Sequence, residues 1–448
     1  MSPSEPTAER SGPAARAEDD ALLAREASLW ESFLEAGNLR QALRRVRANR
    51  GAPGVDGMTT EQLAPWLAGH WPEVRTALDE GTYRPTLVRR VTIPKPDGGE
   101  RLLGVPTVLD RLIQQAIAQV LAPIFDPAFS ESSYGFRPGR SAHQAVRAAA
   151  EHIEAGYRQV VDVDLERFFD RVQHDGLMAR VARKVSDRKL LRLIRAYLDA
   201  GVMVEGVKQA SEEGTPQGSP LSPLLSNIML DDLDRELEAR GHRFVRYADD
   251  VRIFVRSRRA AERVMDGVSG TVEGRLKLKV NRKKSSVRPA TTALLLGFGF
   301  FFREGRVKVR LAPKATKRLK GRLRQLTRRN WRVSMELRIG ALNKFTRGWM
   351  AYFRIAETPS VFHALDDWLY RRLRQVRWKE WKRFSARRRN LRALGMPERS
   401  AALWAASSKG CWRIAGSAVL SRALPRAYWD DLGLQSLSQS WARLRTTA

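Results

Sequence analysis

The sequence predicts an α+β protein in which a region of strands and helices is followed by a basic helical region. Val251, Ile253 and Val255 alternate with other residues, as in a half-buried strand. Residues 109–121 carry an apolar stripe at helical spacing, and from about residue 312 the pattern is helical and rich in Lys and Arg. A chain of 448 residues is too long for one hydrophobic core, so we expect roughly two to four domains.

The composition points to a polyanionic partner. Lys and Arg number 80 against 49 acids, which gives a formal net charge of +31 and favours nucleic acid as the partner. The single cysteine excludes a disulfide scaffold and a Cys-rich zinc site. No apolar run reaches the roughly 18 residues that span a membrane, and no signal peptide opens the chain. We therefore predict a cytoplasmic protein without a membrane partner.

The central feature is a predicted β-hairpin over residues 244–255, with Asp249 and Asp250 at its tip. Adjacent carboxylates repel each other unless a cation lies between them. Mg²⁺ suits the position because it prefers carboxylate oxygens and keeps coordination sites for phosphates. The alternative is a polar turn with two solvated acids, which is common for an isolated Asp-Asp pair.

A further carboxylate lies in the predicted strand at residues 159–165. Asp162 and Asp164 alternate there with valines, and a carboxylate in an apolar strand is costly unless it is paired or binds a metal. Asp164 is the candidate site residue, since Phe168 and Phe169 follow it closely. Asp162 is predicted to be structural.

Several loops could approach phosphates. Arg50 opens a glycine-rich stretch over residues 50–57, which could equally be an ordinary surface loop. A predicted hairpin over residues 91–103 brings Lys95 and Arg101 near its tip, where two cations suit a triphosphate. Residues 133–141 form another turn-rich basic stretch, and residues 214–223 form a Gly/Pro-rich loop that opens a helix.

Further elements follow the hairpin. Strands are predicted at 276–281 and 296–300, and a second hairpin at 301–311. Basic helices then follow, which could lie along a nucleic-acid backbone, although many of their cations could simply be solvated. The tryptophans at 349, 378, 381, 412 and 429 are predicted to be mainly core residues.

Taken together, Asp164, Gln217-Gly218 and Tyr247-Ala248-Asp249-Asp250 resemble the motifs of group II intron reverse transcriptases/maturases, in particular the bacterial class without an endonuclease domain. The resemblance runs from about residue 25 to 448. It implies a right-hand polymerase with fingers and an antiparallel palm sheet, followed by an α-helical thumb or maturase domain. The predicted parts are a disordered tail (1–24), an N-terminal extension (25–83), fingers and palm (84–311), the thumb or maturase domain (312–395) and a C-terminal extension (396–448).

The resemblance also implies residue roles. Asp164, Asp249 and Asp250 would be catalytic and hold two Mg²⁺ ions, with Leu165 in the metal-binding set. Lys95 and Arg101 would clamp the triphosphate, Phe169 would lie under the sugar, Gln217 would orient the nucleotide, and Lys284 would sit near the leaving group. The candidate nucleic-acid contacts are Arg50, Arg137, Arg140, Lys314, Lys317, Arg318, Lys320, Arg371 and Arg374.

Two positions depart from the family pattern. Ser219 stands where a second glycine is usual, which could alter the fit of nucleotide or template. Arg252 lies on the second strand of the hairpin, close to the predicted site. Neither change removes an acid, so we expect polymerase activity to be kept.

The predicted function is Mg²⁺-dependent synthesis of DNA on an RNA template from a primer 3′-hydroxyl, using dNTPs, together with binding of intron RNA to assist splicing and mobility. One alternative is an RNA-binding splicing cofactor as the main role. Another is a domesticated reverse transcriptase in repair or phage defence. Because no Cys/His-rich nuclease module is present, a mobile element would obtain its primer elsewhere, for example at a replication fork.

Overall fold

The computed structural model describes residues 29–94, 100–200, 202–204, 207–209 and 218–446. The chain forms two compact units. The first contains Met1–Ala145 and Gln159–Arg288, and the second contains Val146–Arg158 and Pro289–Ala448. The predicted tail at residues 1–24 lies outside the described residues. The α+β class is confirmed, with a helical C-terminal region.

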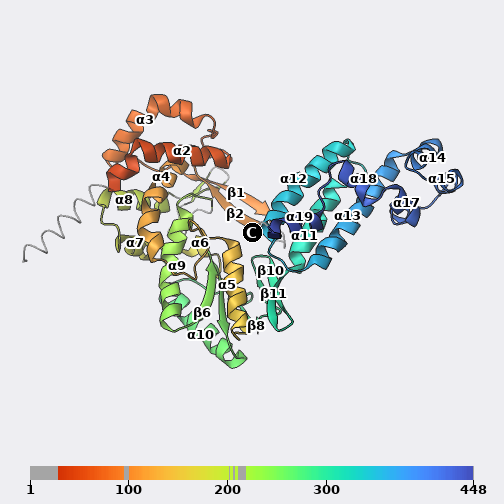
Figure 1. The fold of residues 1–448 in the computed structure, drawn as a ribbon. Coiled ribbons are helices and arrows are strands. Elements are labelled where there is room, and N and C mark those ends of the chain that lie inside the picture. The colour runs from red at the N-terminus through yellow and green to blue at the C-terminus, as the bar shows by residue number, and fades with distance from the viewer. Residues whose placement is uncertain (1–28, 95–99, 201, 205–206, 210–217, 447–448) are drawn as a thin grey trace, which may run out of the picture. The chain divides into compact units, whose positions relative to one another are not determined.

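Helices form the N-terminal part of the first unit (Figure 1). Residues 29–34 are helical, and α2 (Ala36–Asn49) and α3 (Leu63–Asp79) follow. The apolar pattern of the sequence predicts one helix over about residues 26–48, but the helix is interrupted at Glu35, whose ψ of 136° is not helical. Residues 107–110 have the sequence pattern of a capping box, which predicts a helix start there. At the start of α4 (Val108–Phe125), the hydroxyl of Thr107 accepts a hydrogen bond from the Asp110 N–H, as this pattern predicts.

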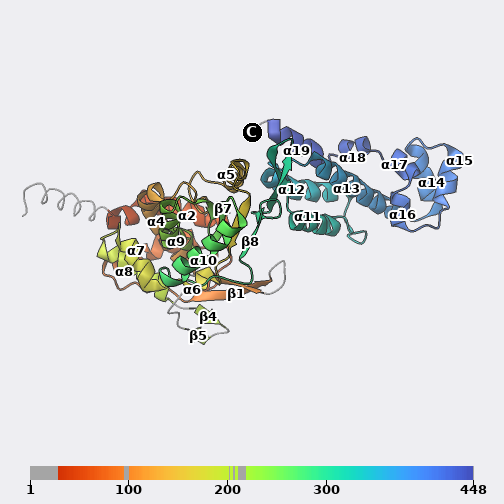
Figure 2. The ribbon, with the colours of Figure 1, turned by 90° about the horizontal axis from the view of Figure 1, so that it is seen from below.

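The first sheet has the strand order β2-β1-β4-β5. The predicted hairpin is present as β1 (Val88–Pro94) paired antiparallel with β2 (Glu100–Val105), while its tip at residues 95–99 lies outside the described residues. Two short strands, β4 (Val202–Val204) and β5 (Val207–Gln209), complete the sheet (Figure 2).

The second sheet, which we call the palm sheet, has the order β6-β7-β3-β8. It contains β6 (Arg243–Tyr247), β7 (Asp250–Val255), β3 (Gln159–Val163) and β8 (Ser286–Pro289). Helix α9 (Ser222–Ala239) packs against β6, and α10 (Arg258–Gly274) packs against β3 and β7. The remaining helical segments of the first unit are α6 (Phe168–Arg171), α7 (His174–Ala182), α8 (Arg188–Asp199) and the short 3-10 turn Asp126–Ala128, while most of α5 (Ala142–Glu154) belongs to the second unit.

Two strand predictions differ from the structure. The predicted strand at 276–281 is irregular, with a single bridge from Val280 to Leu165, because Lys277 has a φ of +57° that interrupts extended backbone. The strand predicted at 296–300 is present but begins at Phe298, because Leu296 and Gly297 form a turn with φ of +51° and +86°. The chain therefore turns back between β9 (Leu294–Leu295) and β10 (Phe298–Arg303).

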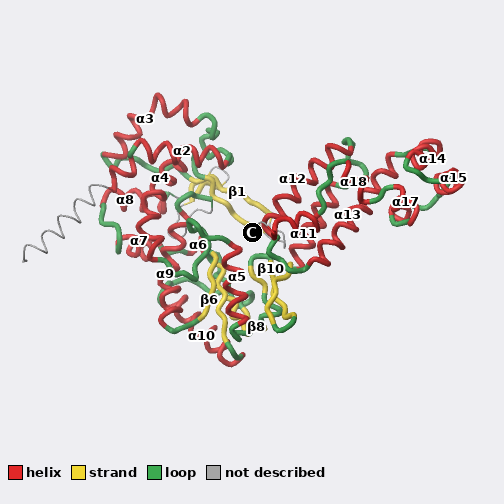
Figure 3. Tube along the Cα trace, in the orientation of Figure 1, coloured by secondary structure: helices red, strands yellow, loops and turns green. Residues whose placement is uncertain are grey.

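In the second unit, β10 pairs with β11 (Arg306–Leu311) around a turn at Glu304–Gly305, as predicted. The chain after β11 consists of helices and loops (Figure 3). These helices are α11 (Pro313–Leu326), α12 (Met335–Phe353), α13 (Pro359–Glu380), α14 (Phe384–Ala393), α15 (Glu398–Ala405), α16 (Cys411–Ala415), α17 (Ala418–Ala423), α18 (Arg426–Asp431) and α19 (Leu437–Thr446). Within the described ranges, none of the helices is both long and apolar enough to cross a membrane.

Candidate active site

The turn between β6 and β7 carries the paired acids. Tyr247 pairs with Asp250, so the loop consists of Ala248 and Asp249 alone, and Asp250 is the first residue of β7. Ala248 has a φ of +58°, in the left-handed region that non-glycine residues rarely adopt. The two acids therefore differ in setting, since one lies on a tight two-residue turn and the other on a strand.

The strand register brings the third acid to the same end of the palm sheet. Val163 on β3 pairs with Val251 on β7. Continuing this antiparallel register by one residue places Asp164 opposite Asp250. Asp162 pairs with Arg252, and alternate residues of a strand share a face. Asp162, Asp164, Asp250 and Arg252 thus project from one face of the sheet.

Main-chain contacts fix the segment that carries Asp164. The Asp164 N–H donates to the Ser285 hydroxyl at 3.0 Å, and the Asp164 carbonyl accepts from the Asn281 N–H at 2.8 Å. The buried side chain of Leu165 is a hydrocarbon without a donor atom, so only the main-chain carbonyl oxygen of this residue could serve as a metal ligand. Lys284 is exposed in the same segment as Asn281 and Ser285.

The departure at Arg252 has a structural consequence. Its guanidinium contacts the carboxylate of Asp250 and lies 2.7 Å from that of Asp162. Arg288 lies 3.7 Å from the other oxygen of Asp162. Burial raises the pKa of the Asp162 carboxyl, and the charge of Arg252 opposes this effect. Arg252 thus pairs with Asp250, the second acid of the Asp249-Asp250 pair.

A cavity of about 580 Å³ opens beside the turn. Asp249, Phe169 and Gly218 line it, so the structure brings these predicted regions together. Gly218 has a φ of +113°, and a Cβ there would lie 2.9 Å from the Gly104 carbonyl oxygen, so a side chain would not fit. Arg45 and Arg111, which the sequence analysis did not single out, also line the cavity and make it cationic.

Two predicted triphosphate and nucleotide contacts, Lys95 and Gln217, lie outside the described residues. The backbone of Arg101 pairs with Ile93 in the β1–β2 hairpin, while its side chain is not described. The glycine-rich loop after Arg50 packs against the start of α4. Arg111 donates to the Ala52 carbonyl at 2.7 Å, and a Cβ on Gly54 would lie 2.6 Å from the Thr107 Cα.

Sequence reasoning missed three buried polar residues behind the turn, namely Arg246, Asp234 and Asn227. Arg246 bonds to Asp234, to Asn227 and to the Ala248 carbonyl. A signal was present, because Arg246 interrupts an apolar strand and Asp234 falls on the buried side of α9. Both positions suggest a buried ion pair, although the sequence does not show that they are partners.

The candidate nucleic-acid contacts fall in several settings. Arg137 is buried and braces its own loop, donating to the Asp126 carboxylate at 2.7 Å. Arg140 pairs with Glu131 and lies over the Tyr134 ring. Arg50, Lys314, Lys317 and Arg318 are exposed, and Lys320 lies over the Trp368 ring. The Cζ of Arg371 lies 4.1 Å from the centroid of the Trp412 ring, and Arg374 donates a hydrogen bond to the Ser421 hydroxyl.

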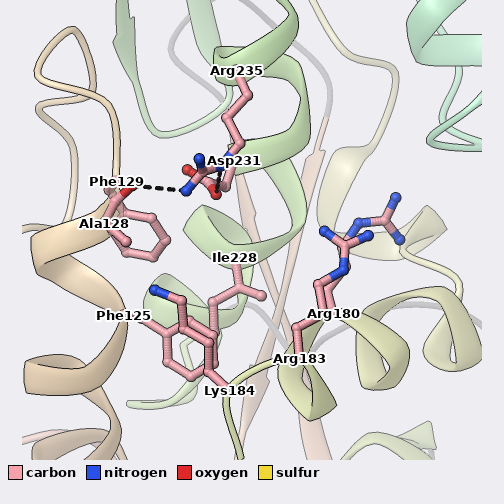
Figure 4. Close-up of a pocket in the computed structure, with 9 residues that line it drawn as sticks. All are labelled: Phe125, Ala128, Phe129, Arg180, Arg183, Lys184, Ile228, Asp231 and Arg235. Atoms are coloured by element: carbon pink, nitrogen blue, oxygen red, sulfur yellow. Dashed lines mark hydrogen bonds and ion pairs between the residues drawn. The ribbon is translucent and has the colours of Figure 1, made fainter.

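A second cavity of about 200 Å³ lies beside α9 (Figure 4). Phe125, Phe129 and Ile228 form its apolar wall. At its rim, Arg235 pairs with Asp231 at 2.7 Å and donates to the Ala128 carbonyl at 3.1 Å. None of the predicted site residues lines this cavity, so we assign the candidate active site to the larger one.

The carboxylates of the palm sheet are oxygen donors of the kind that hard divalent cations prefer. In the part of the chain that the structure describes, no three His, Cys, Asp or Glu side chains are close enough together to hold a metal ion. Asp250 in particular is held by Arg252. The carboxylates of Asp164 and Asp249 still offer the oxygen donors that a divalent ion prefers.

Two stretches of the chain match known protein families. Residues 93–300 match the family described as reverse transcriptase (RNA-dependent DNA polymerase), and residues 316–395 match the group II intron maturase-specific domain. The chain is 35% identical to protein YkfC of Escherichia coli (strain K12), over 56% of this chain and 76% of that protein. It is also 35% identical to the group II intron-encoded protein LtrA of Lactococcus lactis subsp. cremoris, over 43% of this chain and 32% of that protein. A solved structure, a partial Cas6-RT-Cas1–Cas2 complex, is similar over 54% of this chain and 42% of that chain, with 27% identity and a TM-score of 0.35.

Proposed function

We propose that this chain, which belongs to the family of group II intron reverse transcriptases and maturases, extends a DNA primer by copying an RNA template with dNTPs. The observation that carries the proposal is the cavity beside the β6–β7 turn. Asp249 lines it together with Phe169 and Gly218, and the register of β3 and β7 brings Asp164 to the same end of the sheet.

Reverse transcriptases use divalent metal ions, and we propose two Mg²⁺ ions here. Asp164 and Asp249 would be the direct ligands, with the Leu165 carbonyl and Asp250 completing the set. The bound ions would lower the pKa of the primer 3′-hydroxyl and neutralise the triphosphate. Asp250, held by Arg252, would contribute mainly negative charge beside the metal-binding carboxylates.

The other residues bind and orient the substrates. Phe169, in the wall of the cavity, would lie under the sugar and exclude a 2′-hydroxyl. Lys95, Arg101 and Lys284 would bind the triphosphate, and Gln217 would orient the nucleotide. The contribution of the protein is then positioning and charge stabilisation around a reaction that needs little covalent chemistry from it.

The direct test is primer extension by the Asp249→Ala variant. Extension should fall at least about 100-fold, because a preorganised charge is lost where charge develops in the transition state. Glu262→Ala is the control, since Glu262 lies on α10 and pairs only with the neighbouring Arg258 in the described ion pairs. Extension that survives in Asp249→Ala, with circular dichroism unchanged, would refute the proposal.

A second role, binding of intron RNA to assist splicing, is favoured by the match of residues 316–395 to a maturase-specific domain. This role needs cations and no carboxylates. Splicing assistance should therefore persist in Asp249→Ala and fall when the exposed Lys314, Lys317 and Arg318 of α11 are changed to Gln. Loss of splicing assistance in Asp249→Ala alone would contradict the separation of the two roles.

A main role as splicing cofactor, or domestication in repair or phage defence, would leave the same residues in place. Primer extension and splicing assistance are both measured on Asp249→Ala and on the α11 variant with Gln at 314, 317 and 318. The comparison shows whether splicing assistance or polymerisation is the main role. A cytoplasmic location stays a prediction from the sequence.

A further inference from the structure

We infer that Arg246 is a positioning residue that holds the Ala248–Asp249 turn in the geometry needed for metal binding. The inference deepens the proposed function and rests on it for the reaction that is affected. Arg246 itself lies on β6, behind the turn, with none of its surface exposed. It therefore acts through the turn rather than on a substrate.

All three nitrogens of the Arg246 guanidinium donate hydrogen bonds inside the protein. Its Nε donates to both oxygens of Asp234, at 2.8 and 2.9 Å, and its Nη2 donates to the Asp234 Oδ2 at 2.5 Å. Its Nη1 donates to the Asn227 Oδ1 at 2.9 Å and to the Ala248 carbonyl oxygen at 3.0 Å. One rigid planar group thus ties two residues of α9 to the main chain of the turn.

A second set of contacts holds the turn from the other side. Asn227 donates from its Nδ2 to the Gly135 carbonyl at 2.9 Å. Gly135 in turn lies so close to the turn that a Cβ on it would be 2.2 Å from the Ala248 nitrogen. The main chain of Arg246 also donates to the Ser132 carbonyl and accepts from the Tyr134 N–H, both at 2.9 Å. The segment 132–135 is therefore fixed along β6 and against Ala248.

These contacts explain how the turn keeps an unfavourable backbone. Ala248 has a φ of +58°, and such conformations persist only where the surroundings determine them. The Arg246 bond fixes the Ala248 carbonyl, which belongs to the peptide group that leads into Asp249. Without that bond the peptide can rotate, and the Asp249 carboxylate moves with it.

A buried ion pair is a poor way to gain stability, because desolvation of the two charges offsets their attraction. An apolar pair of similar volume could fill the same space. It could not donate a hydrogen bond to the Ala248 carbonyl. The feature that distinguishes the Arg246–Asp234 pair from an apolar pair is therefore its hold on the turn.

The same helix offers a matched control. Arg180 donates to Asp232 of α9 at 2.9 Å, and both side chains are largely buried. Arg180 lines the cavity of Figure 4, and neither Ala248 nor Asp249 of the turn lines that cavity. Asp232 also pairs with the exposed Arg183, which can stay solvated when Asp232 is removed.

The experiment compares two full-length double variants, Arg246→Met/Asp234→Val and Arg180→Met/Asp232→Val. Each removes a buried ion pair without leaving a buried unpaired charge, so both should fold. Binding of Mn²⁺, a carboxylate-binding ion with an electron paramagnetic resonance signal, is measured on the protein alone. We expect the first variant to bind Mn²⁺ about tenfold more weakly and to lose about 100-fold in kcat, with a change of less than about threefold in the nucleotide KM. The second should match the wild type in all three.

Arg246→Lys is a further variant, which tests the positioning role even if Arg246→Met/Asp234→Val fails to fold. Lysine keeps the charge opposite Asp234, but a single ammonium group cannot reproduce the fork to Asn227 and Ala248. It should fold and show the same loss of kcat and Mn²⁺ affinity in weaker form. If either Arg246 variant folds and binds Mn²⁺ as the wild type does, the positioning role is refuted. If the wild type binds Mn²⁺ but does not extend a primer, the proposed function fails while the metal readout still decides the positioning role.

Discussion

Two fully buried arginines, one in each unit of the molecule, have different hydrogen-bond partners. In the first unit, Arg246 is neutralised by Asp234 inside the protein. In the second unit, the described hydrogen bonds of the equally buried Arg338 all go to main-chain carbonyls, those of Leu326, Arg328 and Trp331, at 2.8, 3.2 and 2.8 Å. Its guanidinium also lies over the Trp331 ring. One arginine is held by a charge, and the other by dipoles and a π face.

The composition of the second unit explains the difference. The carboxylates available in residues 289–448 are Glu304, Glu336, Glu357, Asp366, Asp367, Glu380, Glu398, Asp430 and Asp431, among a large excess of Lys and Arg. Asp366 is already used to accept hydrogen bonds from the start of α19. Arginines therefore turn to carbonyls and to aromatic rings, as Arg371 does at Trp412 and Arg387 at Trp378. Because Lys and Arg outnumber these acids, the unit keeps an excess of positive charge that a polyanion could bind.

The largest effect that this comparison predicts is the loss of stability in Arg246→Met. The single change leaves Asp234 fully buried without its cation, which should cost about 3–5 kcal/mol. Burial already raises the pKa of Asp234, and Arg246 opposes this rise. Removing Arg246 therefore raises that pKa further. Denaturant unfolding would measure the loss, with Arg243→Met, an exposed position on the same strand, as the control.

The same variant has a predicted pH dependence. A carboxyl whose pKa is raised in the folded state contributes stability below its ordinary pKa, and this contribution is lost as the pH rises through the folded value. The deficit of Arg246→Met relative to the wild type should therefore grow between pH 5 and pH 8. A deficit that is constant over this range would show that Asp234 is not left charged and buried.

The comparison also shows what the sequence could predict. The turn acids, their strand and the period-2 pattern of Val251, Ile253 and Val255 could be read directly, because alternation and turn chemistry are local. The cap at Thr107 and the hairpin at Glu304–Gly305 are local in the same sense. Family motifs then connected acids that are far apart in the chain.

Long-range partners could not be predicted. Asp234 and Arg246 are close in sequence but become partners only through the packing of α9 on β6. The positive φ of Lys277, which ended a predicted strand, has no marker such as glycine. Trp412 was expected to be core but is 38% exposed, while Trp378 and Trp429 are buried as predicted. Apolar type alone does not decide which tryptophan finds a neighbour.

A smaller effect is predicted for Arg338→Met. The change leaves the carbonyls of Leu326, Arg328 and Trp331 without their donor, which should cost about 1–3 kcal/mol in the free energy of unfolding. The change leaves no buried carboxylate without its cation, so the loss of unfolding free energy should not vary between pH 5 and pH 8. The exposed Arg332 gives the control, since Arg332→Met should stay within about 0.5 kcal/mol.

The two predictions test one idea together, because both variants remove a buried guanidinium of equal charge and size. If Arg338→Met costs as much as Arg246→Met, burial of the arginine itself decides the loss, and the nature of its partner does not matter. If it costs clearly less and is insensitive to pH, the partner decides. Main-chain carbonyls and aromatic rings then stabilise a buried guanidinium without a carboxylate. The second unit can therefore contain few acids and keep a net positive charge.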